Sequence, residues 1–238
     1  MTTTTSWLLP TVAANLLVDV PSTVDWTPPK HEFRPSSLGA CEQYAHYKIN
    51  DEEEEVLDLG REIMFAAGHA AEEAWIKWVN KHWGWNVCHG VDLNNGFGGT
   101  CHPDGVDWTT RTIYELKHTA YKKPAPYHIA QISWYLMRMA NETGRTDWKG
   151  VVVLCDKFGK EPILAEVPFP DPEFQWELYR RALAQRGEVE PQRMCGSYEQ
   201  ATTGARYYDR ETPCGSRTKI SCPYAARCFP DDVMDGFE

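Results

Sequence analysis

Apolar and charged residues alternate in Thr112-Ile-Tyr-Glu-Leu-Lys-His118, and this alternation predicts a strand at the centre of the fold. The side chains of a strand point to opposite faces in turn, so Glu115 and Lys117 share one face while Tyr114 and Leu116 share the other. A carboxylate and an ammonium therefore project side by side from one face of the expected sheet.

A second carboxylate lies upstream, in His102-Pro-Asp-Gly105. Gly105 permits a sharp turn across an expected hairpin, and the turn aims Asp104 at the same edge as Glu115. Two neighbouring carboxylates make a hard oxygen site suited to Mg²⁺ or Mn²⁺, and a lysine beside them can orient or deprotonate a water molecule. The structural alternative is a surface Glu–Lys pair and a turn aspartate.

The flanking sequence predicts an α/β chain, because helical and strand-like periods alternate along it. After a proline-rich lead-in at 21–35, we expect a short helix and then a long one. Short strands, a helix, two further strands and a last helix follow, and regular periodicity fades after Arg186. The expected helices are 38–48, 59–83, 124–140 and 171–185, and the expected strands are 86–93, 98–102, 105–108, 112–119, 150–155 and 162–167.

Length and charge bound the possible functions. The 238 residues, 42% of them hydrophobic, predict one folded domain with a modest appendage. The net charge of −10 argues against a nucleic-acid binder only if it is evenly spread, and it is not. Residues 42–73 hold ten acids and two bases, whereas 111–145 hold six Lys/Arg and two acids. No apolar run approaches the roughly 18 residues of a membrane-spanning helix, and no convincing secretory signal is present. We therefore expect no membrane partner and a cytoplasmic protein of a prokaryotic or phage-infected cell.

Four motifs in order make the chain resemble the PD-(D/E)xK nuclease superfamily, specifically its RecB-like exonuclease branch. Asp104 and Glu115-Leu-Lys117 match the two signature motifs. Gly60-Arg-Glu-Ile-Met-Phe-Ala-Ala-Gly-His69 resembles the additional motif of the branch, whose histidine joins the metal ligands. Gln131-Ile-Ser-Trp-Tyr135 resembles its Q-x-x-x-Y motif, in which the i, i+4 spacing places both side chains on one helix face. Taken alone, His69 is better explained as a satisfied histidine packed on its helix, whereas Gln131 and Tyr135 are equally well explained as ordinary helix residues at the rim of a core.

The resemblance implies a restriction-endonuclease-like core at 31–190, a central mixed sheet flanked by helices, between an N-terminal lead-in at 1–30 and a cysteine-rich segment at 191–238. It also implies a metal-dependent DNA exonuclease that hydrolyses phosphodiester bonds at DNA ends or single strands. In this reading His69, Asp104, Glu115 and the Leu116 carbonyl hold Mg²⁺ or Mn²⁺, Lys117 positions the attacking water, and Gln131 and Tyr135 fix the substrate strand. Lys122, Lys123, Arg138 and His118 are expected to neutralise flanking phosphates, and Tyr121, Tyr127 or Trp134 to stack on bases.

The eight cysteines predict a cluster, because thiols of a reducing compartment more often bind metal than form disulfides. Cys41, Cys214, Cys222 and Cys228 bracket the expected core, and four thiolates suit an iron–sulfur cluster or a structural Zn²⁺. Resemblance to the CRISPR-associated iron–sulfur exonucleases implies a [4Fe–4S] cluster that pins the tail to the first helix. Lys219 stands where that family has a thiol, so Cys195 is an alternative to Cys214. The remaining Cys88, Cys101 and Cys155 are expected to be small buried residues.

Two other functions remain open at this point. One is a non-catalytic DNA-end-binding or assembly subunit of a larger nuclease or integration complex, for which an integrase or recombination proteins are the expected partners. The other is a modification-dependent restriction enzyme with structural zinc, which explains the four-cysteine bracket less well. The biological setting expected from the resemblance is recombination, repair, phage DNA processing or CRISPR adaptation.

Overall fold

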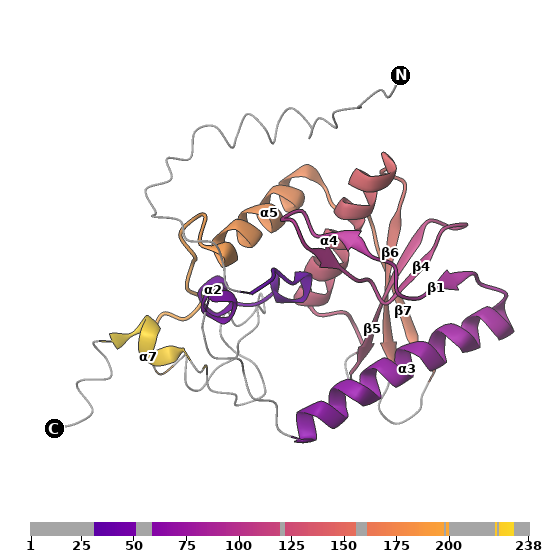
Figure 1. The fold of residues 1–238 in the computed structure, drawn as a ribbon, viewed down its shortest axis with the longest axis horizontal. Coiled ribbons are helices and arrows are strands. Elements are labelled where there is room, and N and C mark those ends of the chain that lie inside the picture. Colours follow the sequence, from indigo (N-terminus) through magenta and orange to yellow (C-terminus); the bar gives the residue numbers. More distant parts are fainter. Residues whose placement is uncertain are drawn as a thin grey trace.

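The computed structural model describes residues 31–50, 59–119, 122–155, 161–197, 199, 222 and 224–230. Its centre is a five-stranded mixed sheet with the strand order β1-β4-β5-β6-β7 (Figure 1). The middle strand β5 pairs antiparallel with β4 and parallel with β6, and β7 pairs antiparallel with β6. The strands of this sheet are β1 (Val87–Cys88), β4 (Gly105–Asp107), β5 (Thr112–His118), β6 (Lys149–Cys155) and β7 (Ile163–Val167), and a separate hairpin pairs β2 (Leu93–Asn94) with β3 (Thr100–Cys101).

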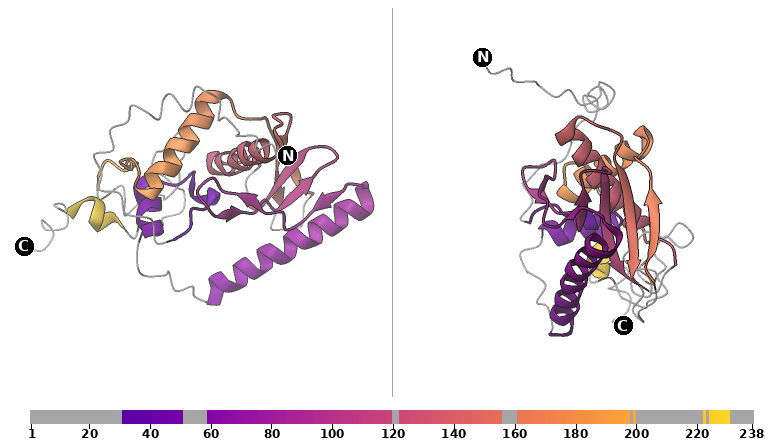
Figure 2. Two further views of the ribbon diagram at one scale, coloured as in Figure 1. Left: turned by 45° about the horizontal axis from the view of Figure 1, so that its top comes forward. Right: turned by 90° about the vertical axis from the view of Figure 1, so that its right-hand side faces the viewer.

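Helices cover both faces of the sheet, as the left view of Figure 2 shows. On one face, Trp75, Ile76 and Val79 of α3 pack against alternate residues of β5 and β6. On the other, α4 and α5 bury Ile132, Leu136 and Leu178 in the larger core. This is the expected α/β core of a mixed sheet flanked by helices. The helical elements are η1 (Pro35–Ser37), α2 (Glu42–Asn50), α3 (Leu59–Trp83), α4 (Pro126–Thr143), α5 (Pro172–Arg186) and α7 (Ala225–Cys228).

Local sequence explains where α4 and α5 begin and end. Each has a proline in its first turn, where the missing N–H costs no helical hydrogen bond. The Asp171 carboxylate caps α5 by accepting the Phe174 N–H at 2.8 Å. Gly144 and Gly187 follow the two helices with φ of 69° and 78°, the left-handed conformation that glycine adopts without strain.

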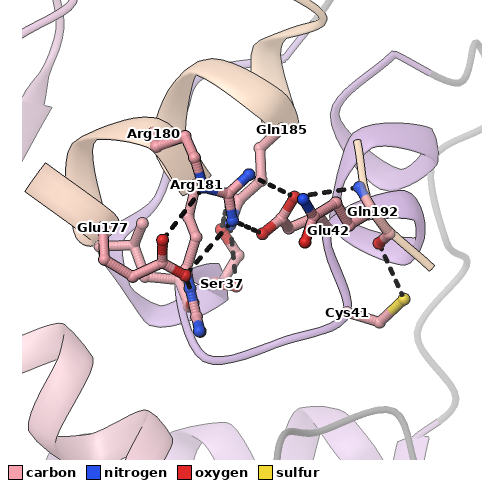
Figure 3. Close-up of polar contacts among 9 residues, drawn as sticks. Ser37, Cys41, Glu42, Glu177, Arg180, Arg181, Gln185 and Gln192 are labelled. Atoms are coloured by element: carbon pink, nitrogen blue, oxygen red, sulfur yellow. Dashed lines mark hydrogen bonds and ion pairs between the residues drawn. The ribbon is translucent and has the colours of Figure 1, made fainter. Parts of the chain in front are cut away.

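A buried ion pair attaches the N-terminal elements to α5 (Figure 3). Glu42, the first residue of α2, is 7% exposed, and both of its carboxylate oxygens accept from the Arg180 guanidinium. The Gln192 N–H also donates to Glu42, at 3.0 Å. Ser37 and Gln185 exchange two further hydrogen bonds, so η1 and α2 are held at one end of α5.

Several element boundaries differ from the sequence predictions. The helix expected at 38–48 begins only at Glu42, because η1 and a turn precede it. The strand expected at 86–93 is two short strands that belong to different sheets, and Gly90 between them has a φ of 71°. In the part of the chain that the structure describes, no helix is long and apolar enough to cross a membrane. The lead-in at 1–30 lies outside the described residues.

Candidate active site

Asp104 is joined directly to the middle strand. Its Oδ2 accepts the backbone N–H of Leu116 at 2.6 Å, so the carboxylate contacts β5 at the residue between Glu115 and Lys117. The antiparallel register pairs Gly105 with Tyr114 and thereby brings the turn before β4 to the later half of β5. The structure therefore brings together the residues of the two signature motifs.

Glu115 is the most deeply buried carboxylate of the site. Its side chain is 1% exposed, and its Oε1 lies 2.5 Å from Lys117 Nζ. Its Oε2 is buried without a hydrogen-bond partner among the described residues. A buried carboxylate oxygen without a partner is unstable unless a cation or a proton satisfies it, so this atom fits a metal ligand.

The electrostatics of the site reflect an excess of buried acid. Burial, and then the nearby Glu115 and Glu72, raise the pKa of Asp104 well above its ordinary value. Burial also raises the pKa of Glu115, against the opposing effect of Lys117. Burial acts to lower the pKa of Lys117, but the Glu115 carboxylate holds it above the usual range, so this lysine is an ammonium at neutral pH.

Glu72 of α3 is the site residue that sequence reasoning missed. Its charge acts on Asp104, Glu115 and Lys117, and its side chain is 17% exposed. His69, the predicted ligand one turn earlier, is 78% exposed, and its Nδ1 lies 3.3 Å from Glu72 Oε2. Helical phase could have indicated Glu72, because it shares the i, i+4, i+7 spacing with the buried Ile76 and Val79.

The helix α4 closes the site from the other side. Gln131 Nε2 donates to Tyr135 Oη at 3.1 Å, and the two side chains are 7% and 4% exposed. Burial, and then the charge of Glu115, raise the pKa of Tyr135, and Asp104 adds to this effect. His128, one turn before Gln131, was not predicted. Burial and the Lys117 ammonium lower its pKa to about 3, and its Nδ1 accepts the Ala125 N–H at 3.2 Å.

A divalent cation suits this donor set, although the side chains are not arranged around one. Glu72, Asp104 and Glu115 offer carboxylate oxygens, the hard ligands that Mg²⁺ and Mn²⁺ prefer. As they stand, however, no three His, Cys, Asp or Glu side chains of the described residues are grouped closely enough to hold a metal ion. In this arrangement the Lys117 ammonium is the cation in contact with Glu115.

Some of the residues expected to contact DNA around the site are exposed, and others are buried or bonded within the protein. Lys122, Lys123 and His118 are exposed. Arg138 instead donates from Nε to the Asn94 carbonyl at 2.7 Å. The expectation that Trp134 stacks on bases is wrong, because its ring is 1% exposed. It packs on Phe33 and Phe97 in the core, Tyr127 packs on His128, and Tyr121 lies outside the described residues.

Cys41, Cys222 and Cys228 all lie where α7 meets α2, but among the described residues they are not grouped closely enough to hold a metal ion, so the expected cysteine cluster is not shown. Cys41 and Cys222 belong to one apolar cluster, and both thiols, after burial, raise the pKa of Cys228. Cys195 is disulfide-bonded, so in this structure it is not a free thiol and does not substitute for Cys214, which lies outside the described residues. Among the three cysteines expected in the core, Cys101 is buried, Cys155 is half-buried and Cys88 is exposed, because it occupies the outward position of β1.

Comparison with known proteins finds similar structures but no family. No protein-family model and no curated protein matches the chain. An alkaline exonuclease from Laribacter hongkongensis is 15% identical with a TM-score of 0.47, and the match covers 67% of this chain and 90% of that one. A phage-related exonuclease from Haemophilus somnus 129PT is 12% identical with a TM-score of 0.42, covering 68% of this chain and 94% of that one. With TM-scores below 0.5, these similarities do not assign a function to this chain.

Proposed function

We propose that this protein is a metal-dependent DNA exonuclease of the PD-(D/E)xK type. The observation that carries the proposal is the buried Glu115 carboxylate, which has one oxygen on Lys117 and one oxygen without a partner, next to Asp104 and Glu72. Buried acids of this density are costly in a merely structural role, and a divalent cation relieves their repulsion. A carboxylate cluster beside a lysine is suited to phosphodiester hydrolysis.

Each residue has a role that follows from its position. Asp104, Glu115 and Glu72, with the Leu116 carbonyl, would hold Mg²⁺ or Mn²⁺, which when bound polarises the phosphodiester and lowers the pKa of a water molecule. Lys117, charged at neutral pH, orients that water and stabilises negative charge on the phosphate oxygens. His69 contacts Glu72, and its proposed role is either to bind the metal ion as a further ligand or to orient the Glu72 carboxylate.

The α4 side of the site is suited to positioning the substrate strand. The Gln131–Tyr135 hydrogen bond fixes the two side chains relative to each other, and the neutral His128 carries its proton on Nε2 because Nδ1 is an acceptor. These groups offer donors to phosphate oxygens without adding positive charge next to Lys117. Lys122 and Lys123, which are exposed just before α4, supply positive charge that attracts a nucleic-acid backbone.

The test compares linear and covalently closed circular DNA of the same sequence. With Mn²⁺, the full-length protein is expected to release nucleotides from the linear form, single- or double-stranded, and to leave the circle intact. EDTA is expected to stop the reaction. Cleavage of the circle would contradict the exonuclease assignment, and hydrolysis that resists EDTA, or no hydrolysis of any DNA, would contradict the metal-dependent nuclease.

We also propose that Cys41, Cys222 and Cys228, with Cys214, hold a [4Fe–4S] cluster. The support is that Cys41 and Cys222 share one apolar cluster and that both thiols raise the pKa of Cys228, although these side chains are not grouped closely enough to hold a metal ion as they stand. A cluster there would join the C-terminal segment to the nuclease core. Zinc is the alternative occupant. An integrase or recombination protein remains the proposed partner if the protein acts within a larger complex.

A further inference from the structure

The β2–β3 hairpin forms a sheet of its own beside the main sheet. Asn94 of β2 lies opposite Thr100 of β3, and the Asn95 N–H donates to the Gly99 carbonyl at 2.9 Å and closes the loop between them. Asn95 is 1% exposed, and its side-chain oxygen accepts the N–H groups of Phe97 and Gly99. The loop is therefore fixed within itself, and contacts from outside the hairpin must set its place in the molecule.

Two side chains of α4 bind the backbone of Asn94. Glu142 Oε1 accepts its N–H at 2.6 Å, and Arg138 Nε donates to its carbonyl at 2.7 Å. On the other strand, Glu32 Oε1 accepts the Thr100 N–H at 2.7 Å. Charged side chains thus take the place that a neighbouring strand has in a larger sheet, and hydrogen bonds to charged groups are stronger than neutral ones. We call Arg138 and Glu142 the hairpin clamp.

The hairpin clamp lies on the same face of α4 as the residues proposed to position the substrate strand. Gln131, Tyr135, Arg138 and Glu142 follow one another at intervals of four, three and four residues, the spacing of one helix face. The first half of this face carries the Gln131–Tyr135 hydrogen bond, and the second half holds the hairpin. One rigid helix therefore connects the two.

The hairpin leads directly to Asp104. Its second strand ends at Cys101, which is 3% exposed, and Asp104 follows three residues later, so the two main chains are at most about 10 Å apart. His102 Nδ1 lies 2.8 Å from Asp92 Oδ1 at the open end of the hairpin. Pro103, the next residue, is buried, and its ring fixes φ. A shift of the hairpin would therefore be passed on to the main chain of Asp104.

We propose that Arg138, together with Glu142, is a positioning residue of the active site: by holding the β2–β3 hairpin on α4, it sets where Asp104 lies relative to Gln131 and Tyr135. The inference rests on the proposed function, in which Asp104 binds the divalent cation. Without the clamp, the hairpin shifts while β5 and α4 keep their places, and the Asp104 carboxylate is presented less well to the cation. Groups that orient a metal ligand in this way strengthen binding without touching the metal ion.

The experiment measures Mn²⁺ affinity without DNA, from the electron paramagnetic resonance signal of free Mn²⁺, with the full-length protein. Arg138→Met keeps the aliphatic stem but loses the donor, and we expect it to weaken Mn²⁺ binding by roughly tenfold. Arg138→Lys can still donate to the Asn94 carbonyl and is expected to retain most of the affinity. Arg145→Met is the matched control, because Arg145 is exposed beyond the end of α4 and pairs with Asp147.

A second comparison separates the positioning of Asp104 from a general effect on the fold. If the clamp acts through Asp104, Arg138→Met changes the Mn²⁺ affinity of an Asp104→Asn protein by less than about twofold, because the two effects are not additive. Glu142→Leu removes the other half of the clamp and is expected to weaken Mn²⁺ binding in the same direction. Urea unfolding of each variant checks that it is folded.

The outcomes distinguish this proposal from the proposed function. Wild-type Mn²⁺ affinity in both Arg138→Met and Glu142→Leu would overturn the positioning role, as would an equal loss from Arg138→Met with and without Asp104→Asn. A protein that binds Mn²⁺ and responds to these changes as expected, but hydrolyses no DNA, would contradict the exonuclease and leave the positioning role standing. A wild-type protein that binds no Mn²⁺ would overturn both.

Discussion

Glu72 tests how the site is assembled at the scale of single residues. Its charge raises the pKa of Asp104 and Glu115, whereas Glu73, the next residue, is exposed and pairs with Lys77. Glu72→Gln removes one of the acids proposed to bind the cation, so we expect a tenfold or greater rise in the Mn²⁺ concentration needed for half-maximal hydrolysis, an effect of roughly 1.4 kcal/mol. Glu73→Gln is the matched control and is expected to leave this concentration unchanged. If hydrolysis depends on Mn²⁺ concentration identically in the two variants, Glu72 does not belong to the metal site.

His128 makes a pH-dependent prediction. Its pKa of about 3 in the folded protein lies below the ordinary value of about 6.5 that it regains on unfolding. Between these values the unfolded chain binds a proton that the folded chain does not, so acid lowers the free energy of unfolding, by roughly 2 kcal/mol from pH 7 to pH 5. His128→Asn removes this contribution. Urea unfolding of both proteins at the two pH values measures it, and equal losses on acidification would contradict the assignment.

At the scale of elements, the approach of η1 to α4 depends on a glycine. A Cβ at Gly39 would overlap the backbone and Cβ of Tyr127, in the first turn of α4. Gly39→Ala is therefore expected to lower the free energy of unfolding by about 1–3 kcal/mol. Gly68→Ala is the control within α3, where a Cβ meets no atom within 4 Å, and we expect it to stabilise the protein by about 0.5–1 kcal/mol. A midpoint of urea unfolding in Gly39→Ala equal to that of the wild-type protein would refute this packing.

The elements also show what the sequence could and could not predict. The strand at 112–118 and the helix of Gln131 and Tyr135 were predictable, because their periods are regular over enough residues. The hairpin at 93–101 was not, because its strands are only two residues long. Glu72 was not predictable from the motif, which ends at His69, and the exposure of Trp83 depends on where α3 ends relative to the sheet.

For the whole molecule, the cluster proposal joins the C-terminal segment to the core. Arg227 lies over the Tyr47 ring at 4.4 Å, so aromatic contacts already hold α7 against α2 near Cys228. We expect the anaerobically purified protein to contain iron and sulfide, and Cys41→Ser to lose both and to expose the segment to limited proteolysis. Cys88→Ser is the control, because Cys88 is exposed on β1. A wild-type protein that holds zinc without iron or sulfide would contradict the iron–sulfur assignment.

For the whole molecule, the distribution of charge is compatible with the proposed activity on DNA. The net charge of −10 includes the acids of the site itself, while the lysines before α4 and those near the C-terminal end of α3 face solvent. The electrostatic repulsion that a phosphate backbone would meet is therefore confined to the acidic segments, and it weakens as salt screens them.

The central claim is that Asp104, Glu115 and Lys117 carry out metal-dependent hydrolysis of DNA, and the most direct measurement is the initial rate of nucleotide release from end-labelled linear DNA in Mn²⁺. We expect Asp104→Asn and Lys117→Met each to lower this rate by about a hundredfold or more, because each removes a group that binds the cation or stabilises the reacting phosphate. Glu166→Gln, an exposed acid on the edge strand β7, is expected to keep the wild-type rate. Wild-type rates in Asp104→Asn and Lys117→Met would contradict the account.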